Sequence, residues 1–380
     1  MQNPLLELGE LNQSVWLDNI HRDMLSNGEL ARLITHDGLK GITSNPTIFQ
    51  KAIAGSRTYD SAIIRILADP SMAGDSRRLF FRLAIEDIQK AADMLKTVYE
   101  SSRGRDGYVS IEVSPDLAYD TQRTVAEAKQ LFAEVNRPNC MIKVPATQAG
   151  IPAIEALIGE GINVNATLLF SVARYEEVVE AYIRGLERRV ANKQPIDHIA
   201  SVASFFISRV DSLVDRLLEE RVAQATSKDK NRYSKIKGSI AIANAKLAYR
   251  AYKKLFFTKR FGDLRQHGSQ TQRLLWASTG TKNPNYSDVL YIEQLVGPDT
   301  VNTMPPSTLD AFRDHGRVHT TLEENLELAA FAITTLEEAG IDLKIVTDQL
   351  EKEGVKAFEN SFNQLLATIE QKLEQARSVN

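Results

Sequence analysis

The sequence predicts an α/β fold, a closed (β/α)8 barrel of the TIM type with extra helices and a C-terminal helical tail. Short apolar or β-branched runs alternate with longer amphipathic segments, which is typical of βαβ units around a parallel sheet. Eight such runs occur, and eight is the number of strands in this barrel.

Each of the eight runs is predicted to form one strand. Each is short, apolar or β-branched, and each is followed closely by a segment with helical spacing. In chain order, the expected strands are residues 15–17, 41–43, 109–113, 141–144, 163–168, 201–206, 274–277 and 300–303.

The segments between the runs place apolar residues at the spacing of an α-helix. The expected helices are residues 79–97, 120–136, 151–159, 172–191, 210–223, 240–259, 322–339 and 342–353, with a charged amphipathic tail at 354–376. The basic stretch 227–238 lies just before one of these helices. We interpret it as a solvated connection, because one short basic stretch is weak support for nucleic-acid binding.

A chain of 380 residues is long enough for two domains, but barrels of this class run to about 250 residues or more as one domain. We therefore predict a single barrel domain over residues 1–380, with an extra helical connection at about 224–270 and C-terminal helices at about 322–378. The tail is longer than a simple barrel requires, and it could pack across one barrel mouth.

The composition excludes several classes of protein. With 43% apolar and 25% charged residues, the chain is in the globular range, and its net charge of −3 gives no basic field to attract nucleic acid or a membrane. Cys140 is the only cysteine, and the metal-site patterns C-x-x-C and H-E-x-x-H do not occur. The acidic N-terminal stretch differs from a signal peptide, and no apolar run approaches the roughly 20 residues of a membrane span. We expect a cytoplasmic protein with a small-molecule partner.

Polar residues that end the predicted strands are the candidates for chemistry, because active sites of parallel barrels lie at the C-terminal ends of the strands. This set contains two carboxylates, one amine, several amides and hydroxyls, and no histidine. Its members are Asp18, Thr43, Asn45, Glu112, Lys143, Asn165, Thr167, Ser204 and Ser278. The set contains no cluster of metal ligands, so we expect no metal.

Lys143 stands out because its neighbours in the strand MIKV are all apolar. Burial of an ammonium group costs several kcal/mol unless the group is paired or loses its proton. Apolar burial favours the neutral amine, which is the form that attacks a carbonyl. The alternative is a lysine that forms an ion pair with Glu112 or Asp18 for structural reasons alone.

The two carboxylates can divide the labour of acid–base catalysis at an amine, one acting in carbon–carbon cleavage and the other through a water on a Schiff base. Structural alternatives stay open for each. Asp18 could cap a helix, since NIHRDML follows it, and Glu112 precedes a Ser-Pro turn that could hold a structural carboxylate. Asn165 and Thr167 share one strand face, where they could position a water or fill a barrel layer.

Six segments resemble motifs of the transaldolase family, and they occur in order along the chain up to the seventh predicted strand. The extra length of this chain, in the connection before Gln270 and in the C-terminal tail, resembles the longer bacterial branch of the family. The segments are GITSNPTIF, IEVSPDLAYD, IKVPATQAG, INVNATLLFS, SFFISR and WAS.

The resemblance implies a role for each catalytic candidate. Lys143 is implied as the Schiff-base lysine and Asp18 as the acid/base in C3–C4 cleavage. Glu112 and Thr167 are implied to hold the catalytic water. The implied substrate-binding residues are Thr43, Asn45, Asn165, Ser204, Phe206, Arg209, Ser278 and Lys282.

One departure from the family pattern concerns the phosphate site. The resemblance implies that Arg209 and Ser278 receive the phosphate, and a guanidinium suits this task because it grips phosphate with two hydrogen bonds. Short forms of the family carry an arginine two residues after the A-S serine, whereas this chain reads ASTGTKNP. Lys282, four residues after the serine, is the nearest cation. It could serve as a point-charge substitute with looser geometry, and the sequence leaves open whether it replaces that arginine.

The implied reaction is the transfer of a dihydroxyacetone unit between sugar phosphates in the non-oxidative pentose phosphate pathway, without a metal or organic cofactor. An aldolase on the same scaffold, which releases free dihydroxyacetone, is the nearest alternative. A barrel that only senses a sugar phosphate would not need Lys143 and both carboxylates, and a metal-dependent lyase would need a ligand cluster. The sequence gives no signal for an oligomeric state.

Overall fold

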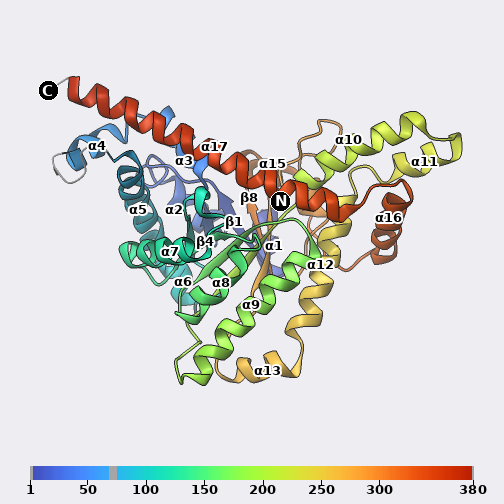
Figure 1. Cartoon of the computed structure of the whole chain (residues 1–380), viewed down its shortest axis with the longest axis horizontal. Helices are drawn as coiled ribbons and strands as arrows, with labels where there is room; N and C mark the ends of the chain where they lie inside the picture. Colours follow the sequence, from blue (N-terminus) through green and yellow to red (C-terminus); the bar gives the residue numbers. More distant parts are fainter. Residues whose placement is uncertain (1–2, 68–74, 379–380) are drawn as a thin grey trace.

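The computed structural model describes residues 3–67 and 75–378 and contains a closed barrel of eight parallel strands (Figure 1). Each strand pairs with the next in the chain, and the last pairs with the first. The strands are β1 (Gln13–Asp18), β2 (Gly41–Thr43), β3 (Tyr108–Glu112), β4 (Cys140–Pro145), β5 (Val164–Leu169), β6 (Ser201–Phe206), β7 (Arg273–Ala277) and β8 (Thr300–Met304). The predicted fold class is confirmed, and no strand boundary differs from its prediction by more than two residues.

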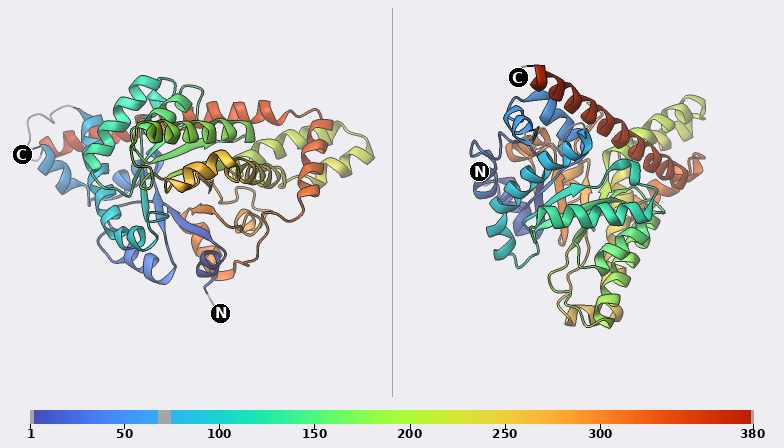
Figure 2. Two further views of the ribbon diagram at one scale, coloured as in Figure 1. Left: turned by 90° about the horizontal axis from the view of Figure 1, so that it is seen from below. Right: turned by 60° about the vertical axis from the view of Figure 1, so that its left-hand side comes forward.

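Helices surround the barrel (Figure 2). Those before β7 are α1 (Pro4–Glu10), α2 (Glu29–His36), α3 (Pro46–Gly55), α4 (Asp60–Leu67), α5 (Ser76–Met94), α6 (Lys96–Ser101), α7 (Thr121–Val135), α8 (Gly150–Gly159), α9 (Val172–Ala191), α10 (Ser208–Gln224), α11 (Ser227–Lys235), α12 (Ile240–Phe256) and α13 (Lys259–Gln266). The remaining helices are α14 (Leu290–Glu293), α15 (Pro306–His315), α16 (Leu326–Glu338) and α17 (Leu343–Ser378). The assignment of the whole chain to one domain stays a prediction, and the ends of its range, 1–380, lie outside the described residues.

The basic stretch 227–238 contains α11, which buries no side chain and so fits the expected solvated, helical connection. The Thr226 hydroxyl caps its first turn by accepting a hydrogen bond from the backbone N–H of Asp229, and Arg232 pairs with Glu338 of α16. One helical prediction was wrong in detail. The tail was expected to begin a new segment at Gly354, but α17 runs through this glycine without a break.

Gly354 is tolerated inside a helix because the helix approaches the barrel closely there. A glycine in a helix interior costs about 1 kcal/mol relative to alanine. A Cβ atom at this position would lie 3.0 Å from Leu168 Cδ2, at the end of β5. The glycine therefore lets α17 pack tightly against the barrel.

Alternate side chains of the first strand point into the barrel interior. They run from the N-terminal end of the barrel to its C-terminal end. Trp16 lies in the middle of this face and is fully buried. A Cβ atom on Gly41 of the neighbouring strand would lie only 2.4 Å from the Trp16 ring, so only glycine fits there. Ser14 lies toward the N-terminal end of the same face and Asp18 toward the C-terminal end.

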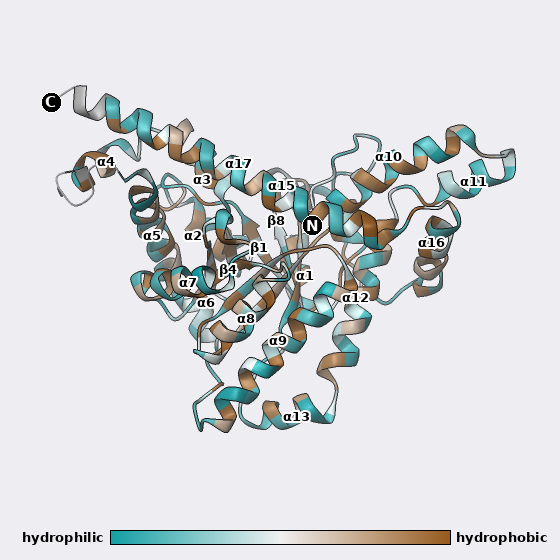
Figure 3. Ribbon diagram, in the orientation of Figure 1, coloured by the Kyte–Doolittle hydropathy of each residue, from teal (hydrophilic) through white to brown (hydrophobic). Residues whose placement is uncertain are grey.

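The C-terminal helix α17 crosses the molecule on the side where the strands end (Figures 1 and 2). It contacts helices α3, α4, α5 and α10 as well as strand β5. The helix is amphipathic along its length (Figure 3), and its apolar side chains Phe358, Phe362, Leu365 and Ile369 are buried. The tail thus packs across the C-terminal barrel mouth. Within the described ranges, no helix is both long and apolar enough to cross a membrane.

Candidate active site

A cavity of about 620 Å³ opens at the C-terminal mouth of the barrel. This volume lies in the range of small-molecule binding sites. All of the predicted site residues line it except Glu112 and Asn165, which lie next to residues that do. The residues selected because they end the predicted strands therefore lie together in the structure. The role of each residue stays a prediction.

Lys143 lies on the inward face of β4, flanked in the sheet by Glu112 of β3 and Asn165 of β5. Lys143 is only 4% exposed, yet it lines the cavity. The Nζ atom donates a hydrogen bond of 3.1 Å to the Ser44 carbonyl and lies 3.5 Å from Glu112 Oε2. A charge-assisted N–H···O bond usually measures about 2.7–2.9 Å, so this ion pair is loose.

Glu112 and Thr167 carry buried polar atoms that lack a hydrogen-bond partner among the described residues. These atoms are both carboxylate oxygens of Glu112 and the hydroxyl of Thr167. Burial raises the pKa of Glu112 to about 7, and the nearby charge of Lys143 opposes this shift. Since buried polar groups without partners are costly, these atoms are suited to bind a water or a substrate group.

Asp18 ends β1 and accepts a hydrogen bond of 2.7 Å from the Thr43 hydroxyl. That hydroxyl also lies 2.7 Å from the Thr303 hydroxyl. Burial raises the pKa of Asp18, while Lys143, the Thr43 hydrogen bond, Arg209 and Lys282 all act in the opposite direction. The alternative of a helix cap is contradicted, because residues 19–28 form an irregular segment with a turn at 22–26 and the next helix begins only at Glu29.

Three predicted phosphate ligands lie on one side of the cavity. Arg209 is in the first turn of α10, with its guanidinium carbon 5.2 Å from the centre of the Phe206 ring. Ser278 has a backbone φ of 56°, and its hydroxyl lies 2.9 Å from that of Ser208. Lys282 is exposed at the cavity rim. Burial lowers the pKa of Arg209 somewhat, with Asp18, Glu112 and Glu353 opposing this, and a guanidinium stays charged at any physiological pH.

The remaining predicted substrate residues are held by local contacts. Asn45 caps α3 by accepting a hydrogen bond of 3.0 Å from the Ile48 N–H, and its amide NH₂ remains available as a donor. Asn165 accepts a hydrogen bond of 2.7 Å from the Ser204 hydroxyl and donates one of 3.2 Å to the Ser110 hydroxyl. Asn165 therefore orients Ser204, which lines the cavity.

The family model "Transaldolase/Fructose-6-phosphate aldolase" matches residues 15–369. Among similar proteins, the Transaldolase of Trichodesmium erythraeum is 46% identical over 99% of both chains, and Transaldolase 2 of Nostoc punctiforme is 47% identical over 98% of both. The Transaldolase of a Parafrankia species is 46% identical over the full length of both chains. The chain belongs to the Transaldolase/Fructose-6-phosphate aldolase family. The family resemblance predicted from the six motifs is confirmed, and so is the expected enzyme class.

Several cavity residues of this transaldolase-family chain escaped the sequence analysis: Asn19, His21, Asp23, Thr47, Lys51, Thr303, Pro305, Pro306 and Phe358. Thr303 ends β8, so the rule applied to the other strands could have found it. Phe358 belongs to the tail and gives no local signal in the sequence. Its position became visible only once α17 was placed.

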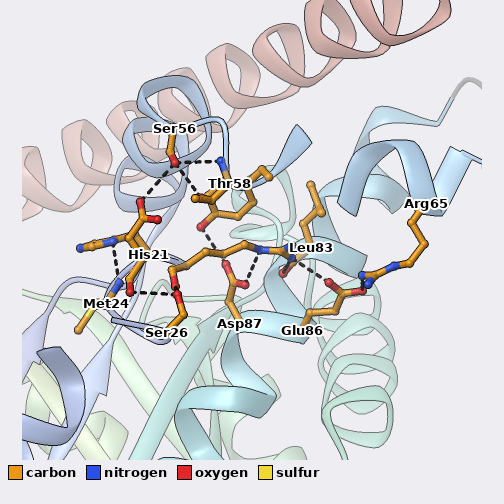
Figure 4. A network of polar contacts seen from close by, with 12 residues as sticks. His21, Met24, Ser26, Ser56, Thr58, Arg65, Leu83, Glu86 and Asp87 are labelled. Atoms are coloured by element: carbon orange, nitrogen blue, oxygen red, sulfur yellow. Dashed lines mark hydrogen bonds and ion pairs between the residues drawn. The ribbon is translucent and has the colours of Figure 1, made fainter. Parts of the chain in front are cut away.

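A polar network holds the segment after β1 beside the cavity (Figure 4). Arg22 donates hydrogen bonds of 2.8 Å to Asp87 and 2.9 Å to Glu86, both in α5. Asp23, which lines the cavity, accepts a bond of 3.3 Å from the Ser56 hydroxyl. These contacts explain how a segment without regular structure supplies cavity residues in fixed positions.

The described ranges contain no group of three or more His, Cys, Asp or Glu side chains arranged to hold a metal ion. The charged groups in and beside the cavity are instead the buried amine of Lys143, the carboxylates of Asp18, Asp23 and Glu112, the guanidinium of Arg209 and the exposed side chains of Lys51 and Lys282. This arrangement can carry out covalent amine chemistry with proton transfer, and it can bind an anionic group on its cationic side.

Proposed function

We propose that the chain transfers a dihydroxyacetone unit from a ketose phosphate to an aldose phosphate through a Schiff base on Lys143. The donors are sedoheptulose 7-phosphate or fructose 6-phosphate, and the acceptors are glyceraldehyde 3-phosphate or erythrose 4-phosphate. The observation that carries the proposal is Lys143 Nζ, buried 3.5 Å from Glu112 and facing the cavity that also contains Asp18 and Arg209. Relatives named Transaldolase, similar over their full length, support it.

The reaction begins when the neutral amine of Lys143 attacks the C2 carbonyl of the donor. The carbinolamine then loses water to become an imine, which requires a proton donor and a proton acceptor at the same place. Glu112, with its pKa raised to about 7, can perform both transfers near neutral pH. The unpaired Thr167 hydroxyl supports a role for the two residues in holding the water.

Cleavage follows from the electron sink that the imine creates. Asp18 takes the proton of the C4 hydroxyl, the C3–C4 bond breaks, and its electron pair moves into the enamine that remains on Lys143. The aldose phosphate leaves, an acceptor aldehyde enters, and the same steps run in reverse. The raised pKa of Asp18 makes it a stronger base than an ordinary aspartate.

Donor and acceptor both carry a terminal phosphate, so one cationic site can serve both. We assign this site to Arg209, Ser278 and Lys282, and the hydroxyl-binding contacts to Thr43, Asn45, Asn165 and Ser204, with Phe206 forming part of the wall. No cofactor is required. The proposed reaction belongs to the non-oxidative pentose phosphate pathway, and we expect it in the cytoplasm.

The proposal is tested by borohydride reduction of the protein with fructose 6-phosphate, with and without erythrose 4-phosphate, followed by digestion and mass spectrometry. We expect a reduced dihydroxyacetone adduct on Lys143 that the acceptor depletes as sedoheptulose 7-phosphate forms. Lys246 is an equally buried lysine outside the cavity, 4% exposed, and should remain unmodified. No adduct and no product from folded protein would refute the proposal. An adduct with free dihydroxyacetone as the main product would favour the aldolase.

A further inference from the structure

The C-terminal helix α17 is fastened across the barrel mouth at several points along its length. Arg174 of α9 pairs with Glu351 at 3.2 Å, and the Thr47 hydroxyl of α3 donates to the Ser361 hydroxyl at 2.8 Å. Farther along, Lys372 pairs with Asp60 of α4 at 2.6 Å. The part of α17 that lies over the cavity is thus held from both sides of the mouth.

Phe358 is the residue of α17 that lines the cavity. It is 5% exposed, and its ring centre lies 5.8 Å from Lys143 Nζ and 6.0 Å from the guanidinium carbon of Arg209. Arg209 also lies over the Phe206 ring, at 5.2 Å. One aromatic ring from the tail therefore lies within cation–π distance of both the proposed nucleophile and the proposed phosphate ligand.

We propose that Phe358 is a specificity-determining residue, which keeps bulk water away from the covalent intermediate on Lys143 and positions Arg209 for the substrate phosphate. This inference rests on the proposed function and deepens it. Phe358 acts by shape and by its π face, since it has no group that can exchange a proton.

The water that Phe358 excludes would divert the reaction. Protonation of the enamine carbon gives an iminium ion, and addition of water to its C2 gives a carbinolamine. When the carbinolamine collapses, its hydroxyl proton passes to the nitrogen and the C2–N bond breaks. Lys143 is then a free amine again, and dihydroxyacetone is released. A closed apolar wall beside the amine slows this hydrolysis, and the intermediate survives until an aldose phosphate arrives.

Ile369 provides a control within the same helix. It lies about three turns farther along α17 and is fully buried in the core. It does not line the 620 Å³ cavity. Phe362 is less suitable, because it lines a small pocket that also contains Glu112 and Asn45. A change at Ile369 weakens the docking of α17, whereas a change at Phe358 also alters the cavity.

The experiment compares F358A, F358L and I369A with the wild type, using fructose 6-phosphate and erythrose 4-phosphate. For F358A we expect the ratio of free dihydroxyacetone to sedoheptulose 7-phosphate to rise about ten-fold, because water reaches the intermediate. The KM for fructose 6-phosphate should also rise about five-fold, the size of one lost cation–π contact. F358L keeps an apolar wall without a π face, so it should raise KM alone. I369A should leave both quantities within about two-fold of the wild type.

The outcomes separate this inference from the proposed function. If wild-type protein forms no adduct on Lys143, the Schiff-base proposal fails and this inference fails with it. If the wild type transfers but F358A and I369A show the same product ratio and KM, Phe358 is only a docking residue and the inference is overturned. If F358A does not fold, F358L decides, because an unchanged KM in a folded F358L protein would remove the positioning role.

Discussion

The barrel contains two buried ion pairs at opposite ends, and they differ in how well they are satisfied. Lys143 and Glu112 lie at the C-terminal mouth, and Arg273 and Asp106 lie at the N-terminal end. The side chains are equally buried, with 5% exposure for the cation and 4% for the carboxylate in both pairs. Burial alone therefore cannot explain any difference in their behaviour.

Hydrogen bonding separates the two pairs. At the N-terminal end, Asp106 accepts bonds of 2.9 Å from Arg273, 2.8 Å from Ser14 and 3.2 Å from Trp16. At the C-terminal mouth the pair is 3.5 Å apart, and neither oxygen of Glu112 has a hydrogen-bond partner in the described parts of the chain. The first pair is a completed structural network, while the second retains hydrogen-bonding capacity for a substrate or water.

The largest expected effect is the loss of activity in K143M. We expect transfer to fall about 10⁴-fold or more, since the other two lysines that line the cavity, Lys51 and Lys282, are exposed and not buried beside Glu112. The free energy of unfolding at pH 6 should change by less than about 1 kcal/mol, because Glu112, with its pKa of about 7, stays protonated once the cation is gone. Activity assays and denaturant unfolding check both parts. K246M is the control, and a similar loss of activity there would contradict the assignment.

The pair at the N-terminal end should show the opposite pattern. D106A leaves the Arg273 guanidinium and the Trp16 N–H buried without their acceptor, so we expect a loss of about 3–5 kcal/mol in the free energy of unfolding. The kcat/KM per folded molecule should stay within about two-fold of wild type. In the control D299N, an exposed pair with Arg105 is lost, at a cost of about 1 kcal/mol or less, and asparagine tolerates the backbone φ of 59° at this position. If both variants lose the same free energy of unfolding, the buried network stabilises the fold no more than an exposed ion pair does.

The comparison is sharpened at Glu112, because burial raises the pKa of its carboxyl to about 7 even though the charge of Lys143 opposes this shift. In the wild type we expect activity to rise with pH through an apparent pKa of about 7, as Glu112 ionises. E112Q should remove this rise of activity with pH and lower kcat about 100-fold. E127Q is the control, because Glu127 accepts bonds from Ser114 outside the cavity, and its profile should match the wild type. If activity still rises with pH through about 7 in E112Q, the titrating group is not Glu112.

The same raised pKa has a consequence for stability, measured by unfolding between pH 4 and 8. The folded pKa of Glu112 is about 7, above the ordinary value of 4.5, so between these values the folded chain holds a proton that the unfolded chain has lost. Stability from this group therefore falls as pH rises across this window, by at most about 1.4 kcal/mol per pH unit. E112Q should lose this part of the slope.

The barrel and most of its cavity were predictable because each depends on local patterns. Alternating runs located the strands, and the position rule for strand ends located Asp18, Lys143 and Thr167 without any knowledge of their contacts. The proposed roles came from the family resemblance. Phe358 could not be predicted, because an aromatic residue in an amphipathic helix is usually core, and only the path of α17 brings it to Lys143.

The N-terminal network was missed for a related reason. The seventh strand was predicted to begin at residue 274, but in the structure it begins at Arg273. A charged residue inside a buried strand is rare without a partner. The partner, Asp106, lies before β3, far away in the chain, and only barrel closure brings the two together. Local patterns thus identify the elements, but the pairing of buried charges depends on the three-dimensional fold.

The smallest expected effects test the comparison at one hydroxyl in each region. S14A removes a hydroxyl that donates to Asp106 and accepts from Arg273, both at 2.8 Å, so we expect a loss of about 1–2 kcal/mol in unfolding free energy with unchanged activity. T167V replaces a buried hydroxyl that has no partner among the described residues, so stability should stay the same or rise slightly. Its kcat should nevertheless fall about ten-fold if the hydroxyl helps to hold the water. Denaturant unfolding and steady-state kinetics on the two variants measure these effects side by side. Equal destabilisation would show that the Thr167 hydroxyl is satisfied in the folded protein, and the two ends of the barrel would then differ less than their hydrogen bonds indicate.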